Sequence, residues 1–247
     1  QIISEFLNDH LLECIHAFPE RYLGLGNLPM QDPDLAIREA QRIQRVGRGG
    51  VQIGSNIHGL NLSDSRFHPV WAELEALDLC VFVHPWNMMG EERMGRYWLP
   101  WLVGMPAESA LAICSLIFGG IFEKFPRLRF AFAHGGGSFP WTLGRIAHGF
   151  DSRPDLVALD NSHPPQKYLG RFFVDSLVHD PKALKFLVDQ MSEDCILLGS
   201  DYPFPLGENP PGKLVESLDF AREIKQKIYY HNAIRFLFGE RKPWTSS

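Results

Sequence analysis

Residues 79–84 read LCVFVH, a short run that is almost wholly apolar and ends in a histidine. Five other runs share this character, and segments with helical patterning separate them. They are YLGLGNL (22–28), GVQIG (50–54), LRFAFAH (128–134), RFFVDSL (171–177) and CILLGSD (195–201). Short apolar strands that alternate with helices are typical of a parallel sheet with helices on its faces. The sequence therefore predicts an α/β fold.

The segments between these strands predict helices. Helices are expected over residues 34–46, 68–77, 107–122, 139–150, 181–190 and 226–238, and the chain opens on a further helical pattern, QIISEFLNDHLLECIHAF. Two architectures share this alternation, an open doubly wound sheet and a closed (β/α)8 barrel. A dinucleotide-binding sheet would carry GxGxxG after its first strand, but GLGNLP has two glycines and then a proline. That motif is too weak to support the doubly wound fold.

Polar residues at the ends of strands favour the barrel. His84, His134 and Asp201 each close an apolar run, and Asp175 lies just inside the end of another. Barrel enzymes collect their polar groups at the carboxyl ends of the strands. The sequence shows six candidate strands, whereas a barrel has eight. We therefore expect residues 1–247 to form a single metal-dependent (β/α)8 TIM barrel domain, incomplete at its N-terminal end because the first two strands are absent.

The composition narrows the class of protein. The 247 residues are 45% hydrophobic and have a net charge of −5 without a basic stripe, so nucleic acid is not an expected partner. The longest apolar stretch, Ala110 to Phe122, is shorter than the roughly 20 residues of a membrane span. Four cysteines occur without a CxxC pair and lie in apolar segments. We expect a cytoplasmic protein that does not enter membranes.

His84, His134 and Asp201 are residue types that suit a zinc-like divalent metal in a barrel mouth. Taken singly, each has a structural reading, as a hydrogen-bonded histidine or a turn aspartate. Two protein ligands would be too few, because catalytic zinc usually holds about three and a water. His134 precedes three glycines, which let a substrate approach the backbone while the imidazole accepts or donates a proton.

Two further features lie near these strand ends. Arg145 follows Ser138 by seven residues, so on a helix it is roughly 10 Å along the axis from the turn. It forms either a surface ion pair or a contact with a neighbouring subunit. The segment YWLPWLVGMPAE (97–108), which contains Trp101, either packs in a core or interface or covers the active site.

The motifs together resemble one family. GLGNLPMQ, GVQIG, FVHPW, YWLPWLVGMPAE, FAHGGGSFP, LVHDP and GSDYPFPLGE occur in the order found in the 2-amino-3-carboxymuconate-6-semialdehyde decarboxylases of the amidohydrolase superfamily. The resemblance runs from about Leu7 to Gly239. It implies a (β/α)8 barrel of amidohydrolase type that removes carbon dioxide without oxidation from a small anionic substrate of tryptophan catabolism, the kynurenine pathway. It also implies one divalent metal, most often zinc, no organic cofactor, and a homodimer.

The resemblance assigns roles to individual positions. His84 and Asp201 match metal ligands, and His134 matches the catalytic histidine beside the metal-bound water. Arg145 matches an arginine that reaches the partner subunit's site and holds a substrate carboxylate. Trp101 and Phe204 match aromatic residues that line or gate the pocket.

The sequence also departs from the family pattern. Family members begin with a strand that carries His-x-His, which supplies two further metal ligands, and a second substrate-binding arginine follows. The histidines before His84 lack that spacing; they are His10, His16, His58 and His68. Two alternatives therefore stand beside the decarboxylase: a related amidohydrolase-type hydrolase or aromatic-acid decarboxylase, and a catalytically inactive barrel remnant that dimerises.

Overall fold

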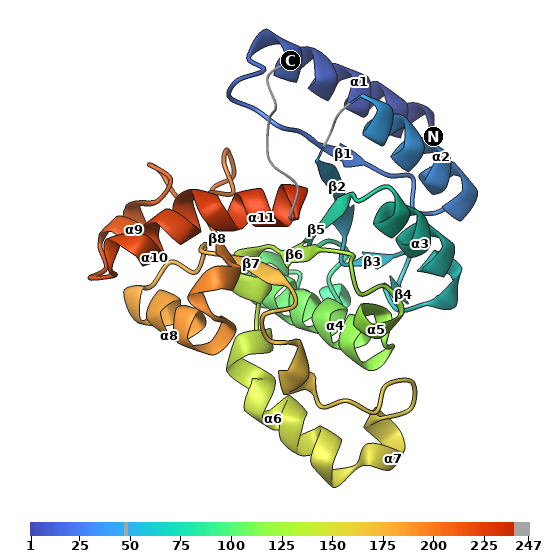
Figure 1. Cartoon of the computed structure of the whole chain (residues 1–247). Coiled ribbons are helices and arrows are strands. Elements are labelled where there is room, and N and C mark those ends of the chain that lie inside the picture. Colours follow the sequence, from blue (N-terminus) through green and yellow to red (C-terminus); the bar gives the residue numbers. More distant parts are fainter. Residues whose placement is uncertain (47–48, 240–247) are drawn as a thin grey trace.

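A six-stranded parallel sheet forms the centre of the molecule. The structure is a computed structural model that describes residues 1–46 and 49–239. The strands lie side by side in chain order, as β1 (Leu25–Asn27), β2 (Gly50–Gly54), β5 (Cys80–His84), β6 (Phe130–Phe132), β7 (Phe173–Asp175) and β8 (Ile196–Leu197). Helices surround this sheet (Figure 1). All six strands predicted from the apolar runs are therefore confirmed, and the α/β architecture is consistent with a TIM barrel.

The register of the sheet brings the carboxyl ends of the strands to one edge. Every neighbouring pair is parallel, and β2 and β5 pair over five residues, from Gly50 with Cys80 to Gly54 with His84. Within residues 1–46 and 49–239, β1 and β8 are the outer strands. A two-residue hairpin that the sequence did not indicate follows β2, with β3 (Asn56–Ile57) antiparallel to β4 (Leu60–Asn61).

The predicted helices are present with small shifts at their ends. The α-helices are α1 (Ile2–Ala17), α2 (Pro33–Arg45), α3 (His68–Ala76), α4 (Met105–Phe118), α5 (Ile121–Lys124), α6 (Phe139–Ser152), α7 (Pro154–Val157), α8 (Pro181–Met191), α9 (Lys213–Glu216), α10 (Arg222–Gln226) and α11 (Asn232–Phe238). The single helix expected over residues 107–122 is wrong, because Gly120 has a φ of 69° and separates α4 from α5.

The two faces of the sheet belong to different apolar clusters. Alternate residues of the strands, among them Val81, Phe130 and Val174, join the larger cluster, which includes the side chains of α3 and α4. The residues between them belong to or contact the smaller cluster. In that cluster the ring centroids of Phe173 and of Phe236 in α11 lie 5.5 Å apart. Alternation of this kind places each strand in the core on both faces. The strands are thus rigid supports for residues at their carboxyl ends.

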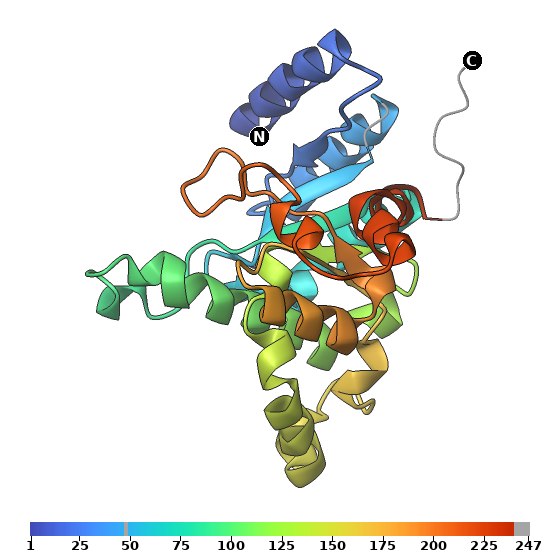
Figure 2. The same ribbon diagram turned by 90° about the vertical axis from the view of Figure 1, so that its left-hand side faces the viewer.

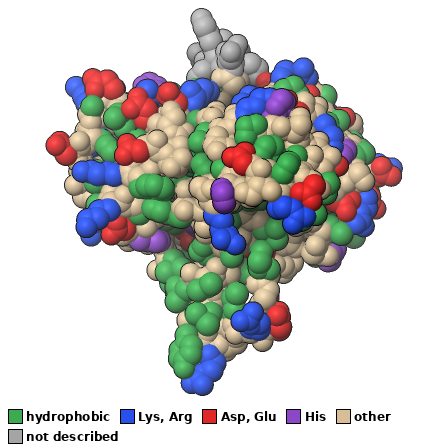
Figure 3. All heavy atoms as spheres, turned by 90° about the horizontal axis from the view of Figure 1, so that it is seen from below, with side chains coloured by type: hydrophobic (Ala, Val, Ile, Leu, Met, Phe, Trp, Pro, Cys, Tyr) green, Lys and Arg blue, Asp and Glu red, His purple; other side chains and the backbone are tan. Residues whose placement is uncertain are grey.

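The chain between β5 and α4 projects from the body of the molecule. It contains a short helix, η2 (Glu91–Arg93), and a π-helical turn, η3 (Pro100–Gly104), which leads into α4. This segment, green in Figure 2, extends away from the sheet. Hydrophobic side chains gather along a projection at the foot of Figure 3, and exposed residues of the segment include Tyr97, Leu102 and Val103. We call residues 88–104 the arm.

The arm and α4 form one continuous apolar run. Pro100–Phe118 has 19 residues, and its most apolar 18-residue part has a mean hydropathy of 1.6, enough by length and composition alone to cross a membrane. This run is longer than the stretch Ala110 to Phe122 seen in the sequence, because η3 extends α4 toward its N-terminus. However, 44% of the run's most apolar part is buried inside the protein, and Ile113, Leu116 and Ile117 belong to the core. A core helix of a globular domain has the same features.

Candidate metal centre

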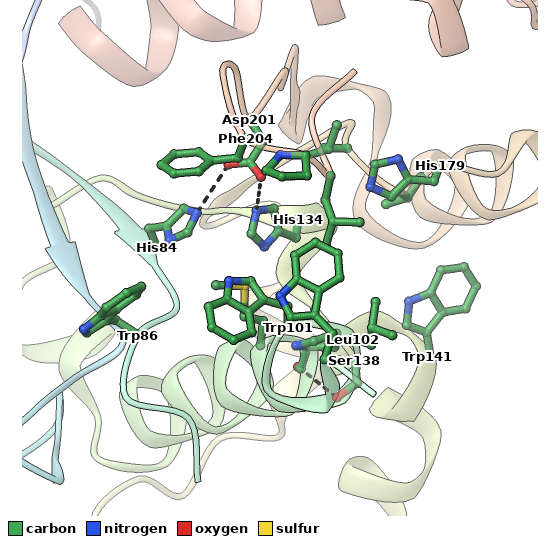
Figure 4. Close-up of a pocket in the computed structure, with 18 residues that line it drawn as sticks. His84, Trp86, Trp101, Leu102, His134, Ser138, Trp141, His179, Asp201 and Phe204 are labelled. Carbon is green, nitrogen blue, oxygen red and sulfur yellow. Dashed lines mark hydrogen bonds and ion pairs between the residues drawn. The ribbon is translucent and has the colours of Figure 1, made fainter. Parts of the chain in front are cut away.

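Three side chains converge at the carboxyl edge of the sheet. His84 ends β5, His134 opens the turn after β6, and Asp201 lies in the loop after β8. Figure 4 shows both imidazoles directed at the Asp201 carboxylate. His84 Nε2 lies 3.6 Å from Asp201 Oδ1, and His134 Nε2 lies 3.8 Å from Asp201 Oδ2. The sequence thus predicted correctly that these three residues meet, while the role of each is a separate question.

The backbone at two of the three residues has an uncommon conformation. His134 has a φ of 56° and Asp201 a φ of 50°. Such values cost about 1–3 kcal/mol for a residue other than glycine and occur most often at functional sites. The sequence predicted that His134 and Asp201 each close a strand, and this is wrong in detail. His134 begins a 3₁₀ turn after β6, and Asp201 lies four residues beyond the end of β8.

Glycines make the His134 turn possible. Gly135, Gly136 and Gly137 all have positive φ, at 63°, 74° and 62°. A Cβ atom on Gly137 would lie 2.4 Å from the carbonyl oxygen of Pro106. Ser138 is the N-cap residue of α6 but makes no side-chain capping hydrogen bond; its hydroxyl donates to that same carbonyl, at 3.1 Å. The glycines therefore let the His134 turn lie directly against the start of α4.

His84 is held in one tautomer with a free nitrogen toward Asp201. Its Nδ1 lies 3.2 Å from the carbonyl oxygen of Pro85, and because a carbonyl only accepts, Nδ1 carries the proton. Burial lowers the pKa of His84, the neighbouring His134 lowers it further, and Asp201 opposes this. A neutral imidazole with a lone pair on Nε2 is the form that binds a metal ion.

The spacing of the three side chains fits one divalent cation. Their donor atoms lie within 4.8 Å of one another. Ligand atoms about 2.0–2.2 Å from a tetrahedral zinc are about 3.3–3.6 Å apart, close to the two distances to Asp201. Two imidazole nitrogens and a carboxylate oxygen are also a donor set that zinc and manganese accept. Among the described residues this is the one such group of three.

A cavity of about 400 Å³ adjoins the three side chains. Trp101 and Phe204 line it, as the sequence predicted, and Trp101 stacks on Trp98 with ring centroids 5.8 Å apart. The other lining residues are mostly apolar, and in the described part of the chain no lysine or arginine is among them. Arg145 is exposed on α6 and does not line this cavity. Its expected action at a neighbouring subunit stays a prediction.

Several residues of the cavity were not predicted. His179, Trp86 and Trp141 contribute to its wall, with His179 and Trp141 at the end away from His84 (Figure 4). His179 follows β7 in the turn LVHDP and has a φ of 61°. Its position after a strand was a usable signal, because polar groups that follow parallel strands meet at one edge. Trp86 lies in the loop after β5 and Trp141 lies in the first turn of α6, and the sequence gives little guide to the direction of either side chain.

A buried carboxylate joins the arm to the β3–β4 hairpin. Glu108 of α4 is only 2% exposed. It accepts hydrogen bonds from Nδ2 of Asn56, at 2.9 Å, and from the backbone N–H of Met89, at 2.9 Å. The same Asn56 amide donates to the carbonyl oxygens of Trp86 and Asn87. Glu108 and Asn56 thus fix the start of the arm, just after His84, in one position.

Comparisons with known proteins agree with this geometry. The family model described as Amidohydrolase matches residues 2–239. Over 95% of its own length, this chain is 54% identical to a 2-amino-3-carboxymuconate-6-semialdehyde decarboxylase of Dictyostelium discoideum. Over 96% of its own length, it is 36% identical to one of Caenorhabditis elegans. It spans 66% and 72% of those two proteins.

A solved structure shows the same fold with a metal. It is a 5-carboxyvanillate decarboxylase of Novosphingobium aromaticivorans, in a mutant form with bound manganese, which is 25% identical and superposes with a TM-score of 0.87. The match covers 96% of this chain and 70% of that one. Both the sequence relatives and this structure are thus decarboxylases by name.

Proposed function

The chain belongs to the amidohydrolase family. We propose that it functions as a metal-dependent decarboxylase that removes carbon dioxide from 2-amino-3-carboxymuconate-6-semialdehyde. The observation that carries the proposal is the convergence of His84, His134 and Asp201 at the mouth of an aromatic-lined cavity. The two relatives that share 54% and 36% identity bear the name of this activity. This name also supports a place in tryptophan catabolism, through the kynurenine pathway.

The proposed metal is one divalent ion, with zinc as the first choice. His84 and Asp201 would supply two of its protein ligands, and no organic cofactor is needed. When bound, the ion supplies Lewis-acid chemistry and a local positive charge for an anionic substrate. The manganese in the 5-carboxyvanillate decarboxylase makes manganese the second ion to test.

His134 is proposed as the acid–base residue. Its Nε2 faces the Asp201 carboxylate at 3.8 Å and its side chain is 18% exposed, so it can both reach the cavity and exchange a proton. Loss of carbon dioxide leaves electrons on the substrate carbon, which must take up a proton. A histidine at this position can deliver that proton without rearrangement of the backbone.

The walls of the cavity would bind and enclose the substrate. Trp101 and Phe204 supply flat apolar surface that suits a conjugated chain and excludes water. Because the described lining lacks lysine and arginine, a second source of positive charge is required for a substrate with two carboxylates. We propose that Arg145 of a second copy supplies it, in a homodimer.

Further properties belong to the same proposal. The exposed apolar side chains of the arm, among them Tyr97, Leu102 and Val103, supply a surface that a second copy of the chain could cover. A cytoplasmic location is supported by the four cysteines, none of which forms a disulfide.

The test measures metal and activity separately. The 247-residue chain is loaded with zinc or manganese, its metal content is measured, and decay of the ultraviolet absorption of the semialdehyde is followed together with release of carbon dioxide. Parallel assays use an aromatic acid, an ester and an amide. We expect one ion per chain and decarboxylation of the semialdehyde alone. Turnover of the ester or amide would favour a hydrolase, and a chain that binds the ion without turnover of any substrate would support the inactive remnant.

A further inference from the structure

Asp175 occupies the strand between the two turns of the candidate metal centre. It ends β7, which pairs with β6 on one side and β8 on the other. His134 follows β6 and Asp201 follows β8. Asp175 is 6% exposed and lies outside the group of three candidate ligands. A carboxyl group is rarely buried in this way unless its oxygens have partners.

The first contact of Asp175 is with the His134 turn. Its Oδ1 accepts the backbone N–H of Gly135, at 3.0 Å, and the N–H of Leu177, also at 3.0 Å. Gly135 is the residue directly after His134. Since His134 and Gly135 both have positive φ, this hydrogen bond stabilises a turn that costs energy to form.

The second contact of Asp175 is with the loop that leads to Asp201. A Cβ atom on Gly199 would lie 2.7 Å from Cγ of Asp175 and 2.9 Å from its Oδ2, so the bare backbone of Gly199 rests against the carboxyl group. The neighbouring Ser176 Oγ accepts the N–H of Gly199 at 3.2 Å. Gly199 precedes Asp201 by two residues. One side chain therefore touches the backbone on both sides of the His134–Asp201 pair.

From these contacts we propose that Asp175 is a positioning residue that sets the separation of His134 from Asp201, and with it the affinity of the site for a divalent ion. The inference rests on the metal site of the proposed function. The role requires a hydrogen-bond acceptor of this size at Oδ1, and the acceptor does not have to carry a charge. Loss of a group that orients metal ligands from outside typically weakens binding about 10- to 100-fold.

Substitutions at Asp175 separate the acceptor from the charge. Asp175→Asn keeps an oxygen at Oδ1 and nearly the same volume, whereas Asp175→Ala removes the acceptor. Zinc affinity is measured by competition with a chelator dye, and the visible spectrum of the cobalt-loaded protein reports the geometry at the ion. We expect a loss of about 10- to 100-fold in zinc affinity and an altered cobalt spectrum for Asp175→Ala. Asp175→Asn should stay within about threefold of the unchanged chain, because its acceptor is retained.

A second pair of variants keeps the test decisive if Asp175→Ala fails to fold. Gly199→Ala pushes a methyl group against the Asp175 carboxyl, while Gly149→Ala on α6 meets no atom within 4 Å. We expect Gly199→Ala to lower zinc affinity and Gly149→Ala to leave it unchanged. Asn161→Ala is the control for general destabilisation, because Asn161 is a buried hydrogen-bonding residue that contacts Ile117 and Tyr168 away from the site.

The possible results divide clearly. Normal zinc affinity and cobalt spectrum in both Asp175→Ala and Gly199→Ala would overturn the proposal, and so would a loss in Asp175→Asn as large as that in Asp175→Ala. A loss in Asn161→Ala equal to that in Asp175→Ala would also overturn it. A chain that binds zinc with the expected order of affinities but does not decarboxylate would refute the proposed function and leave the role of Asp175 intact.

Discussion

The Nε2 atom of His84 lies 3.6 Å from Oδ1 of Asp201, although 117 positions separate the two residues along the chain. His84 ends β5 and Asp201 follows β8, so a parallel sheet with its carboxyl ends at one edge is what brings them together. The two strands between them lead to the other groups of the site, since His134 opens the turn after β6 and Asp175 ends β7.

The proposed division of roles predicts different losses at the three converging residues. His84→Ala and Asp201→Ala should weaken zinc binding by at least about 100-fold, because each removes a ligand. His134→Ala should weaken zinc binding less, by about 10- to 100-fold, because it removes the side chain that lies against Asp201, but it should lower kcat by about 10²- to 10⁴-fold, the usual contribution of general acid–base catalysis. Zinc titration and steady-state kinetics measure the two effects, with His16→Ala on the exposed face of α1 as the control.

Equal loss of zinc in all three variants would contradict this division and make His134 a ligand. The structure is compatible with that arrangement, since all three donor atoms lie within 4.8 Å of one another. The kinetic measurement is therefore informative only together with the metal content of each variant.

The sequence predicted the fold and the central group of residues for one physical reason. Apolar runs such as LCVFVH and LRFAFAH form buried strands, and parallel pairing then fixes where their ends lie. The backbone after the strands was not predictable in this way. The positive φ of His134 and Asp201, the hydroxyl of Ser138 on the Pro106 carbonyl and the place of His179 depend on contacts between distant segments. Local residue preferences contain little information about such contacts.

Trp101 is predicted to act on substrate binding more than on chemistry. It lines the cavity and stacks on Trp98, but it is not among the three converging polar side chains. Trp101→Ala should raise KM by about tenfold, the loss of one aromatic contact, with a smaller change in kcat. Trp101→Phe should recover most of the difference. A fall in kcat with unchanged KM would place Trp101 in the chemical step instead.

Glu108 is predicted to stabilise the start of the arm. Without the Glu108 carboxylate, the backbone N–H of Met89 loses its acceptor and the side-chain amide of Asn56 loses one of its acceptors, at a buried position. Glu108→Ala should therefore lower the free energy of unfolding by about 2–4 kcal/mol. Denaturation with urea measures this value. Glu92→Ala, in the exposed η2, is the matched control and should change it by less than about 0.5 kcal/mol.

The four cysteines are predicted to differ in reactivity. Burial raises the pKa of the Cys114 thiol to about 11, so this thiol stays protonated at pH 8 and reacts slowly. Cys14 is exposed on α1, whereas Cys80 and Cys195 are buried. Alkylation of the folded chain with iodoacetamide should label Cys14 first, and Cys14→Ser should remove the fast phase. Cys114 should react only as the pH approaches about 11 or after denaturation. Fast labelling of Cys114 at pH 8 would contradict its buried environment.

Arg145 is predicted to complete the site of a second copy, and mixed dimers test this directly. His134→Ala and Arg145→Ala chains should each be nearly inactive alone. Mixed in equal amounts, they should recover about a quarter of the wild-type rate, since half of the dimers are mixed and each has one intact site.

The reverse combination is the matched control. A chain that carries both substitutions is mixed with the wild-type chain, so that the one intact His134 of each mixed dimer faces a partner without Arg145. These dimers should be inactive if Arg145 acts across the interface. If they retain activity at one site, Arg145 acts within its own chain, and the exposed position of Arg145 on α6 would then require α6 to move toward the cavity.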